Sequence, residues 1–202
     1  MLSMNNTENL NCHINLHFLC ASLSKVYYII KSLKDVTSFQ MLWTIYYAYF
    51  QLWMKYCIIF WGRDRDSVKV FHVQGRVIWL ISGVKTHDPC RHIFMEYKIQ
   101  TVASLHILEV SCFVKKFKGY LKHNFCIHTY NKISNIDLHT VSCNTALFQG
   151  SVVDMCGKLY NRLPERLKTL SDFKSFKRHV KFLLLSNSFM CTIKEFLQFY
   201  RS

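Results

Sequence analysis

Apolar residues recur at helical spacing along much of the chain, and three stretches show this most clearly. The first stripe consists of Leu19, Leu23, Val26, Tyr27, Ile30 and Leu33. The second follows Asp66 and consists of Val70, Phe71, Val77, Ile78 and Ile81, with the polar Gln74 on the same side and Gly83 placed to end the helix. The third runs from Thr101 to Phe117, with Leu105, Leu108, Cys112 and Phe113 on one side. Because residues three and four apart share one face of a helix, the spacing predicts three amphipathic helices.

The residues between the first two stripes are apolar on almost every side. Asp35 and Ser38 can cap a helix whose inner face carries Leu42, Ile45, Tyr46 and Tyr49. From Met41 to Trp61 the only charge is Lys55, and the length suits a membrane-spanning helix. Tyr and Trp residues lie mid-span, however, rather than at the two membrane interfaces. We therefore expect residues 41–56 to form a helix buried against residues 19–33 and 68–82, with a membrane anchor at 41–61 as the alternative.

The helical pattern is interrupted from about Lys118 to Gly150 and then returns. The next stripe consists of Val152, Met155, Cys156, Leu159 and Tyr160 and stops at Leu163, because a residue before proline disfavours helical geometry. Ser171 is expected to open a helix with Phe173, Phe176, Val180, Leu183 and Leu184 inward. Thr192 and Glu195 form a capping box for a last short helix. The predicted fold class is mainly α.

Charge is the most informative part of the composition. The chain has 26 Lys and Arg against 12 Asp and Glu, a net charge of +14, which favours a polyanionic partner. A dense basic run includes Lys168 and the residues that we take as candidate nucleic-acid contacts: Lys158, Arg162, Arg166, Lys174, Lys177, Arg178 and Lys181. A solvated helix face would also explain this run; phosphate contact is the functional interpretation. A second run, at Lys115, Lys116, Lys118 and Lys122, suits the C-terminus of a helix in any case.

Catalytic signatures are missing from the sequence. It has no adjacent aspartates for a two-metal polymerase site, and no phosphate-binding loop, nucleophile elbow or HExxH helix. Asp64 and Asp66 are expected to cap a helix, and His13 and His17 lack an acidic third ligand nearby. We therefore expect no catalytic residue, metal, cofactor or small-molecule substrate.

Cysteine usage bears on the cellular compartment. None of the nine cysteines forms a CxxC pair, and residues 1–7 do not resemble a secretory signal. We expect buried, reduced thiols and an intracellular protein of the nucleus or cytoplasm, not a secreted one.

Short segments spread over residues 10–200 resemble, in order, the part of jockey-type non-LTR retrotransposon reverse transcriptases that follows the catalytic palm. The matching segments are Leu10–Ile14, Leu23–Ile30, Ile45–Phe50, Tyr56–Gly62, Val73–Gly83, Cys90–Phe94, His128–Asn131, Leu159–Pro164 and Phe173–Lys177. Some informative positions depart from the family. Cys57 replaces a glycine, Gly75 and Trp79 replace basic residues, and Lys132 follows Asn131 where Thr-Arg is usual.

The resemblance implies an organisation and a function. Residues 10–85 would be a thumb-like helical bundle, 86–117 connecting helices, 118–150 an irregular linker and 151–202 a basic helical unit. The palm, the fingers and the endonuclease of the family would lie before residue 1. The implied function is non-catalytic binding of template-primer or RNA backbone, without sequence preference, with the missing palm and fingers as further partners. A decayed element product with no function is the other alternative.

Overall fold

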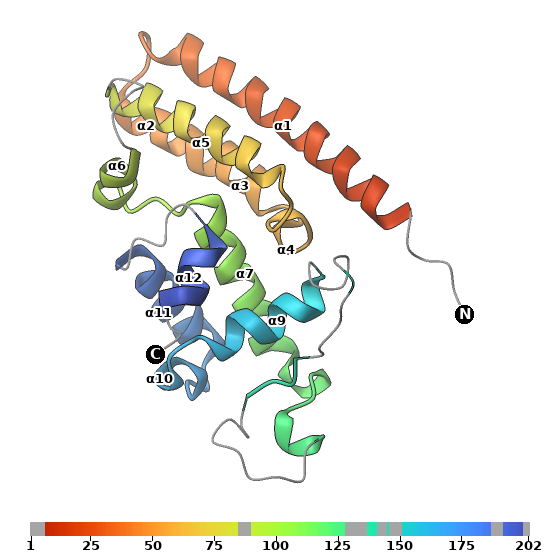
Figure 1. Ribbon diagram of the computed structural model, residues 1–202. Coiled ribbons are helices and arrows are strands. Elements are labelled where there is room, and N and C mark those ends of the chain that lie inside the picture. Colours follow the sequence, from red (N-terminus) through yellow and green to blue (C-terminus); the bar gives the residue numbers. More distant parts are fainter. Residues whose placement is uncertain are drawn as a thin grey trace. The chain divides into compact units, whose positions relative to one another are not determined.

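The computed structural model describes residues 7–84, 90–127, 137–140, 145, 151–186 and 192–199 (Figure 1). Within these ranges the chain is mainly α-helical, which confirms the predicted fold class, and its β-structure is an isolated bridge between His123 and Leu138. The chain divides into two compact units, Met1–Val102 and Ala103–Ser202. This division falls inside the segment 86–117 that the sequence treats as connecting helices.

Two long helices form the framework of the N-terminal unit. Helix α1 (Thr7–Leu33) and helix α5 (Ser67–Ser82) pack along each other, and Figure 1 shows them side by side in orange-red and yellow. Their predicted stripes supply much of the core, including Leu23, Ile30, Val70, Val77 and Ile78. Gly83 ends α5 with φ of 72°, as the sequence predicts for a left-handed C-cap.

The apolar stretch after α1 packs against both long helices, as expected. It runs through α2 (Phe39–Ile45), a π-helical turn η1 (Tyr46–Phe50) and α3 (Gln51–Lys55). Ser38 caps α2 by accepting a hydrogen bond from the Met41 amide at 3.3 Å, which confirms that predicted cap.

The π turn changes which residues face the core. The Gln51 amide donates to the Tyr46 carbonyl five residues back, so this turn contains one residue more than an α-helical turn. The buried side is therefore Leu42, Tyr46, Phe50 and Met54. Tyr49, predicted to be buried, is 60 % exposed; the prediction is wrong because it assumed α-helical spacing throughout.

The Met41–Trp61 stretch does not continue as one helix. Helix α3 ends at Lys55, Cys57 adopts a left-handed backbone with φ of 52°, and a separate turn α4 (Ile58–Trp61) follows. No helix in the described part of the chain has both the length and the apolar character needed to cross a membrane. Helix α6 (Cys90–Glu96) and the residues after it complete this unit. Buried Gln74 donates from Nε2 to the Tyr46 hydroxyl at 2.9 Å and to the Gln100 carbonyl at 2.8 Å.

The predicted role of the two aspartates before α5 is only partly right. Asp66 occupies the N-cap position, but its carboxylate makes no capping bond and lies 3.0 Å from the Lys69 amino group. Asp64 instead accepts a hydrogen bond from the Asp66 amide at 2.9 Å. A local Asx turn therefore stabilises this connection rather than a side-chain cap.

The C-terminal unit contains α7 (Val102–Phe117), α9 (Val152–Asn161), α10 (Glu165–Lys168), α11 (Phe173–Ser186) and α12 (Ile193–Phe199). The 3₁₀ turns η2 (Lys118–Tyr120) and η3 (Asn124–Cys126) lie in the predicted linker. Asp172, not the predicted Ser171, caps the N-terminus of α11, since its carboxylate accepts from the Ser175 amide at 2.8 Å. Thr192 accepts from the Glu195 amide at 3.3 Å, which confirms half of the predicted capping box.

Candidate nucleic-acid interface

A partly buried polar network positions the helices α9 and α10, which carry some of the basic residues. Both ends of the Asn161 side-chain amide bond the Leu138 backbone: Nδ2 donates to its carbonyl at 2.8 Å and Oδ1 accepts from its amide at 2.9 Å. The Lys168 side chain is only 10 % exposed. Its amino group lies 3.1 Å from the Asp137 carboxylate, 3.3 Å from that of Glu165 and 2.9 Å from the Asn161 carbonyl. Asn161 and Lys168 therefore hold α9, α10 and residues 137–138 together.

Lys115 connects α7 to the same assembly. Its amino group donates to the Lys168 carbonyl at 3.0 Å and lies 5.4 Å from the centre of the Phe176 ring. Burial, followed by the charge of Lys118, lowers the pKa of Lys115. This lysine of the second basic run thus contributes to the packing of the unit.

The exposed row consists of Lys174, Arg178 and Lys181 on α11, and it is the strongest feature of the interface. These residues stand four and three positions apart, so they share one side of the helix. All three are exposed, and none forms an ion pair within the described ranges. Phe176, Val180, Leu183 and Leu184 are buried on the opposite side, which orients the row toward solvent.

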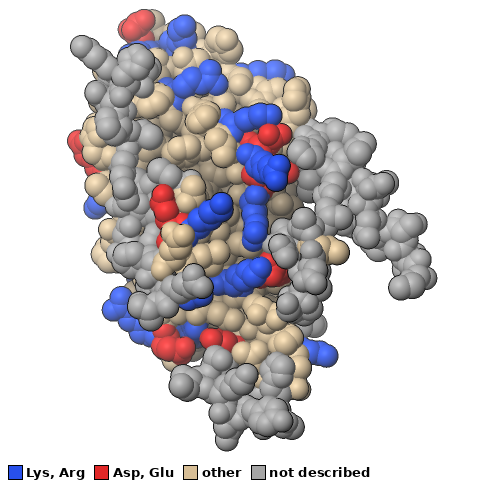
Figure 2. All heavy atoms as spheres, in the orientation of Figure 1, with Lys and Arg blue, Asp and Glu red and all other residues tan. Residues whose placement is uncertain are grey.

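Lys177 and Lys158 differ from the row because each has an acidic partner. The Lys177 amino group lies 3.6 Å from the Glu109 carboxylate on α7, and both side chains are partly exposed. The Lys158 amino group lies 2.7 Å from the Asp154 carboxylate, which is 2 % exposed. Figure 2 shows several basic side chains with acidic side chains directly beside them. Lys158 thus neutralises a buried charge, and its cation is less available to a ligand than those of the row.

The two predicted arginines outside α11 lie elsewhere in the unit. Arg162 is half-buried at the C-cap of α9. Arg166, on α10, lines a groove with His179 and Phe182 of α11, and it is exposed. The structure therefore brings Lys174, Arg178 and Lys181 together, with Lys177 beside them, and places Lys158, Arg162 and Arg166 apart from the row.

Sequence reasoning missed the groove between α10 and α11. It measures about 480 Å³, and Leu167, Leu170 and Leu183 are among the residues that line it. Phe182 also lines the groove and is 70 % exposed. A helical projection of residues 173–186 would have found this ring, because Phe182 lies outside the predicted apolar stripe.

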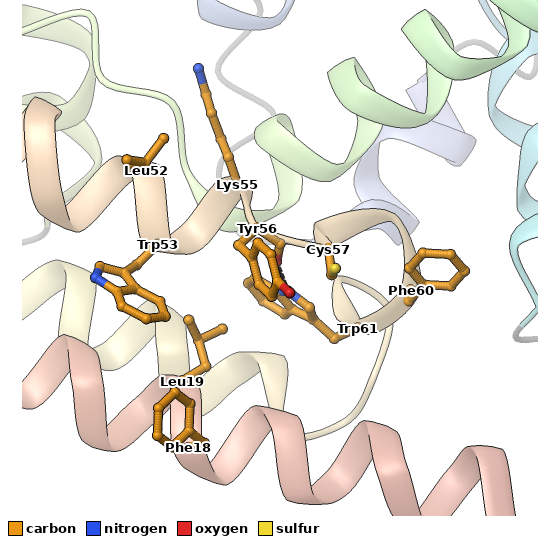
Figure 3. Close-up of a pocket in the computed structure, with 9 residues that line it drawn as sticks. All are labelled: Phe18, Leu19, Leu52, Trp53, Lys55, Tyr56, Cys57, Phe60 and Trp61. Atoms are coloured by element: carbon orange, nitrogen blue, oxygen red, sulfur yellow. Dashed lines mark hydrogen bonds between the residues drawn. The ribbon is translucent and has the colours of Figure 1, made fainter.

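A larger apolar groove lies in the N-terminal unit (Figure 3). It measures about 850 Å³ and is lined by Phe18, Leu19, Leu52, Trp53, Lys55, Tyr56, Cys57, Phe60 and Trp61. The Trp61 indole donates to the Tyr56 carbonyl at 2.8 Å, while the Lys55 side chain extends away from the rings. The lining offers no acid–base pair, so its chemistry is that of an apolar surface.

Burial affects the cysteine thiols of the described ranges to different degrees. Burial raises the pKa of the Cys112 and Cys156 thiols to about 11, which makes both poor nucleophiles. Cys57 and Cys126 are exposed, so the prediction of buried thiols is wrong for these two. No three His, Cys, Asp or Glu side chains among the described residues gather closely enough to hold a metal ion.

Comparison with known proteins adds no assignment to this geometry. No protein-family model, curated protein or solved structure matches the chain.

Proposed function

We propose that the C-terminal unit binds the phosphate backbone of nucleic acid, without sequence preference, through the exposed row of α11. The observation that carries this proposal is that Lys174, Arg178 and Lys181 face solvent together and form no ion pair within the described ranges, with only the exposed Asp172 in electrostatic contact with Arg178. Cations in such a row displace the counterions condensed on a polyanion, whatever its base sequence. Lys177 lies beside the row and would strengthen its field.

The spacing of charge within α11 supports a functional rather than a structural origin. Lys174 and Arg178 are four residues apart, and so are Lys177 and Lys181. Like charges at this spacing destabilise a helix by about 0.2–0.5 kcal/mol per pair. A helix face selected only for solubility would carry mixed charges, whereas a polyanion removes the repulsion when it binds.

We also propose that the chain derives from the thumb and downstream region of a jockey-type reverse transcriptase and has no polymerase activity of its own. The Cys57 backbone supports this origin: φ is 52° at the position where that family has glycine, the residue that favours left-handed geometry. The segment Leu159–Pro164, which resembles a motif of that family, is also important for packing. Leu159, Tyr160 and Leu163 are buried, and the Asn161 side chain bonds the backbone of Leu138.

The binding proposal is tested by removing the row and, separately, an equal charge elsewhere. Lys174→Gln/Arg178→Gln/Lys181→Gln is compared with Lys25→Gln/Lys31→Gln/Lys34→Gln, whose three lysines are exposed on and just after α1. Anisotropy of a labelled 15-nucleotide strand at low salt should show a loss of affinity on the order of tenfold for the row variant. The α1 variant should lose much less. Equal losses would show that only net charge matters, and the row would have no special role.

The absence of polymerase activity is tested by primer extension. We expect the purified chain to extend no primer with Mg²⁺ and nucleotides, because two-metal nucleotide transfer needs carboxylates that hold both ions. Extension that co-purifies with the protein through two further columns would contradict this expectation.

A further inference from the structure

The solvent face of α11 combines cations with an exposed aromatic ring. Phe182 is 70 % exposed, one helical turn after Arg178 and next in sequence to Lys181. On its other side the ring lines the α10–α11 groove, where Arg166 and His179 are also found. Phe182 therefore has basic side chains on both of its sides.

The groove beside the ring is shaped by both helices. Leu170 and Leu183 provide apolar surface, and Arg166 provides a cation. The His179 Nδ1 donates to the Ser175 carbonyl at 2.8 Å, because a carbonyl oxygen can only accept. This bond fixes the imidazole on the groove side of α11. The groove volume of about 480 Å³ falls within the range of clefts that bind small ligands.

An aromatic ring flanked by cations is suited to an unpaired nucleic-acid strand. Bases of a single strand can stack on an aromatic side chain while basic residues contact the backbone. In a duplex the faces of the bases are already stacked on their neighbours, so Phe182 would gain no base contact there. Stacking on the Phe182 ring would therefore favour single strands over duplex, whereas the row of cations alone would not distinguish them.

We propose that Phe182 and the α10–α11 groove accept an unpaired nucleobase, so that this surface prefers single-stranded nucleic acid to duplex. Arg178 and Lys181 contact phosphates on one side of the stacked base, and Arg166 contacts a phosphate on the other. The inference rests on the proposed backbone binding and adds a strand preference to it.

The test measures the full chain against labelled oligouridylate and oligothymidylate 15-mers and a 15-base-pair duplex. Wild-type protein should bind both single strands more tightly than the duplex. Phe182→Leu keeps apolar volume without the ring, and it should lose about five- to a hundred-fold in single-strand affinity, the range of one lost base stack, with duplex affinity unchanged. Phe182→Trp should retain the preference. Phe173→Leu, which removes the half-exposed ring at the start of α11, is the matched control and should change neither affinity.

The outcomes separate this inference from the proposed function. The inference would be overturned if wild-type protein bound single strands and duplex equally, or if Phe182→Leu left single-strand affinity unchanged. In either case, binding that depends on the row would still support the proposed backbone contact. A wild-type protein that binds none of the three probes would overturn both. Circular dichroism of each variant confirms that α11 is still folded. If Phe182→Leu proves misfolded, Phe182→Tyr with retained preference and Phe182→His with reduced preference provide the same comparison.

Discussion

The two units of this chain expose different chemistry on their helices. In the N-terminal unit the stretch from α2 to α4 turns aromatic and apolar side chains to solvent, among them Met41, Tyr49, Leu52, Tyr56 and Phe60. In the C-terminal unit α11 exposes Lys174, Arg178 and Lys181. An apolar face gains free energy by leaving water, whereas a cationic face gains most from a polyanion. The proposed nucleic-acid contact therefore rests on the row of the C-terminal unit rather than on the net charge of the whole chain.

The largest expected effect is a difference in the free energy of unfolding between variants of a partly buried lysine and of an exposed lysine in the C-terminal unit. Lys168→Met should lower the free energy of unfolding by about 2 kcal/mol, because Asp137 loses a charged hydrogen bond in a mostly buried position. Lys181→Met should change it by less than about 0.5 kcal/mol, since surface substitutions usually do. Urea denaturation followed by circular dichroism checks both. Equal stabilities would contradict the division between structural and exposed lysines.

Replacing one glycine in each unit by alanine compares how tightly the two positions are packed. A Cβ at Gly157 on α9 would stand 2.5 Å from the Thr140 Cγ2, whereas one at Gly75 on α5 would meet only the Trp79 ring at 3.8 Å. Gly75→Ala should therefore stabilise by up to about 1 kcal/mol, the usual gain in helix propensity. Gly157→Ala should destabilise by about 1 kcal/mol net, because overpacking exceeds that gain.

A second substitution, at Thr140, tests whether the contact with this residue causes the loss of stability in Gly157→Ala. Thr140→Ser removes the obstructing methyl group, so Gly157→Ala/Thr140→Ser should recover most of the loss in thermal melts. If Gly157→Ala alone raised the melting temperature as Gly75→Ala does, the close approach of α9 to Thr140 would be wrong.

The smallest expected effect concerns the backbone between α3 and α4. Cys57→Gly should stabilise the N-terminal unit by about 0.5–1 kcal/mol, because a residue with a Cβ is strained at φ of 52°. Cys57→Ala removes the thiol but keeps the Cβ, and it should not stabilise. Thermal denaturation of the two variants distinguishes relief of backbone strain from loss of the exposed thiol; a gain in both would point to the thiol.

Much of the fold was predictable wherever polar and apolar residues alternate at helical spacing. The inner faces of α5 and α11 follow from their stripes, except that Phe173, predicted to face inward, is 39 % exposed at the first turn of α11. Ser38, Gly83 and Thr192 end or begin helices as their chemistry predicts. The buried face of residues 39–55 could not be predicted correctly because this stretch is apolar on several sides. Spacing alone could not choose its buried face there, and the π turn at Tyr46–Phe50 shifted that face by one residue.

The candidate interface was predictable as a set of charges but not as a surface. Sequence spacing places Lys174, Arg178 and Lys181 off the apolar stripe, and the structure does the same. The spacing of four residues between Asp154 and Lys158 allowed an ion pair on one helix, but the sequence did not show that Asp154 is buried. The sequence also did not show that Lys177 meets Glu109 from α7, because that contact comes from tertiary packing. Both pairs affect which cations are available to a ligand.

The salt dependence of binding tests the central claim most directly. Wild-type protein and Lys174→Gln/Arg178→Gln/Lys181→Gln are titrated with one labelled strand over a series of salt concentrations. If the row releases counterions from about three phosphates, the slope of log affinity against log salt should be shallower in the variant by about 2 to 3. The α1 triple variant should keep the wild-type slope. Parallel slopes for wild-type and row variant would contradict the account, because the row would then make no phosphate contacts.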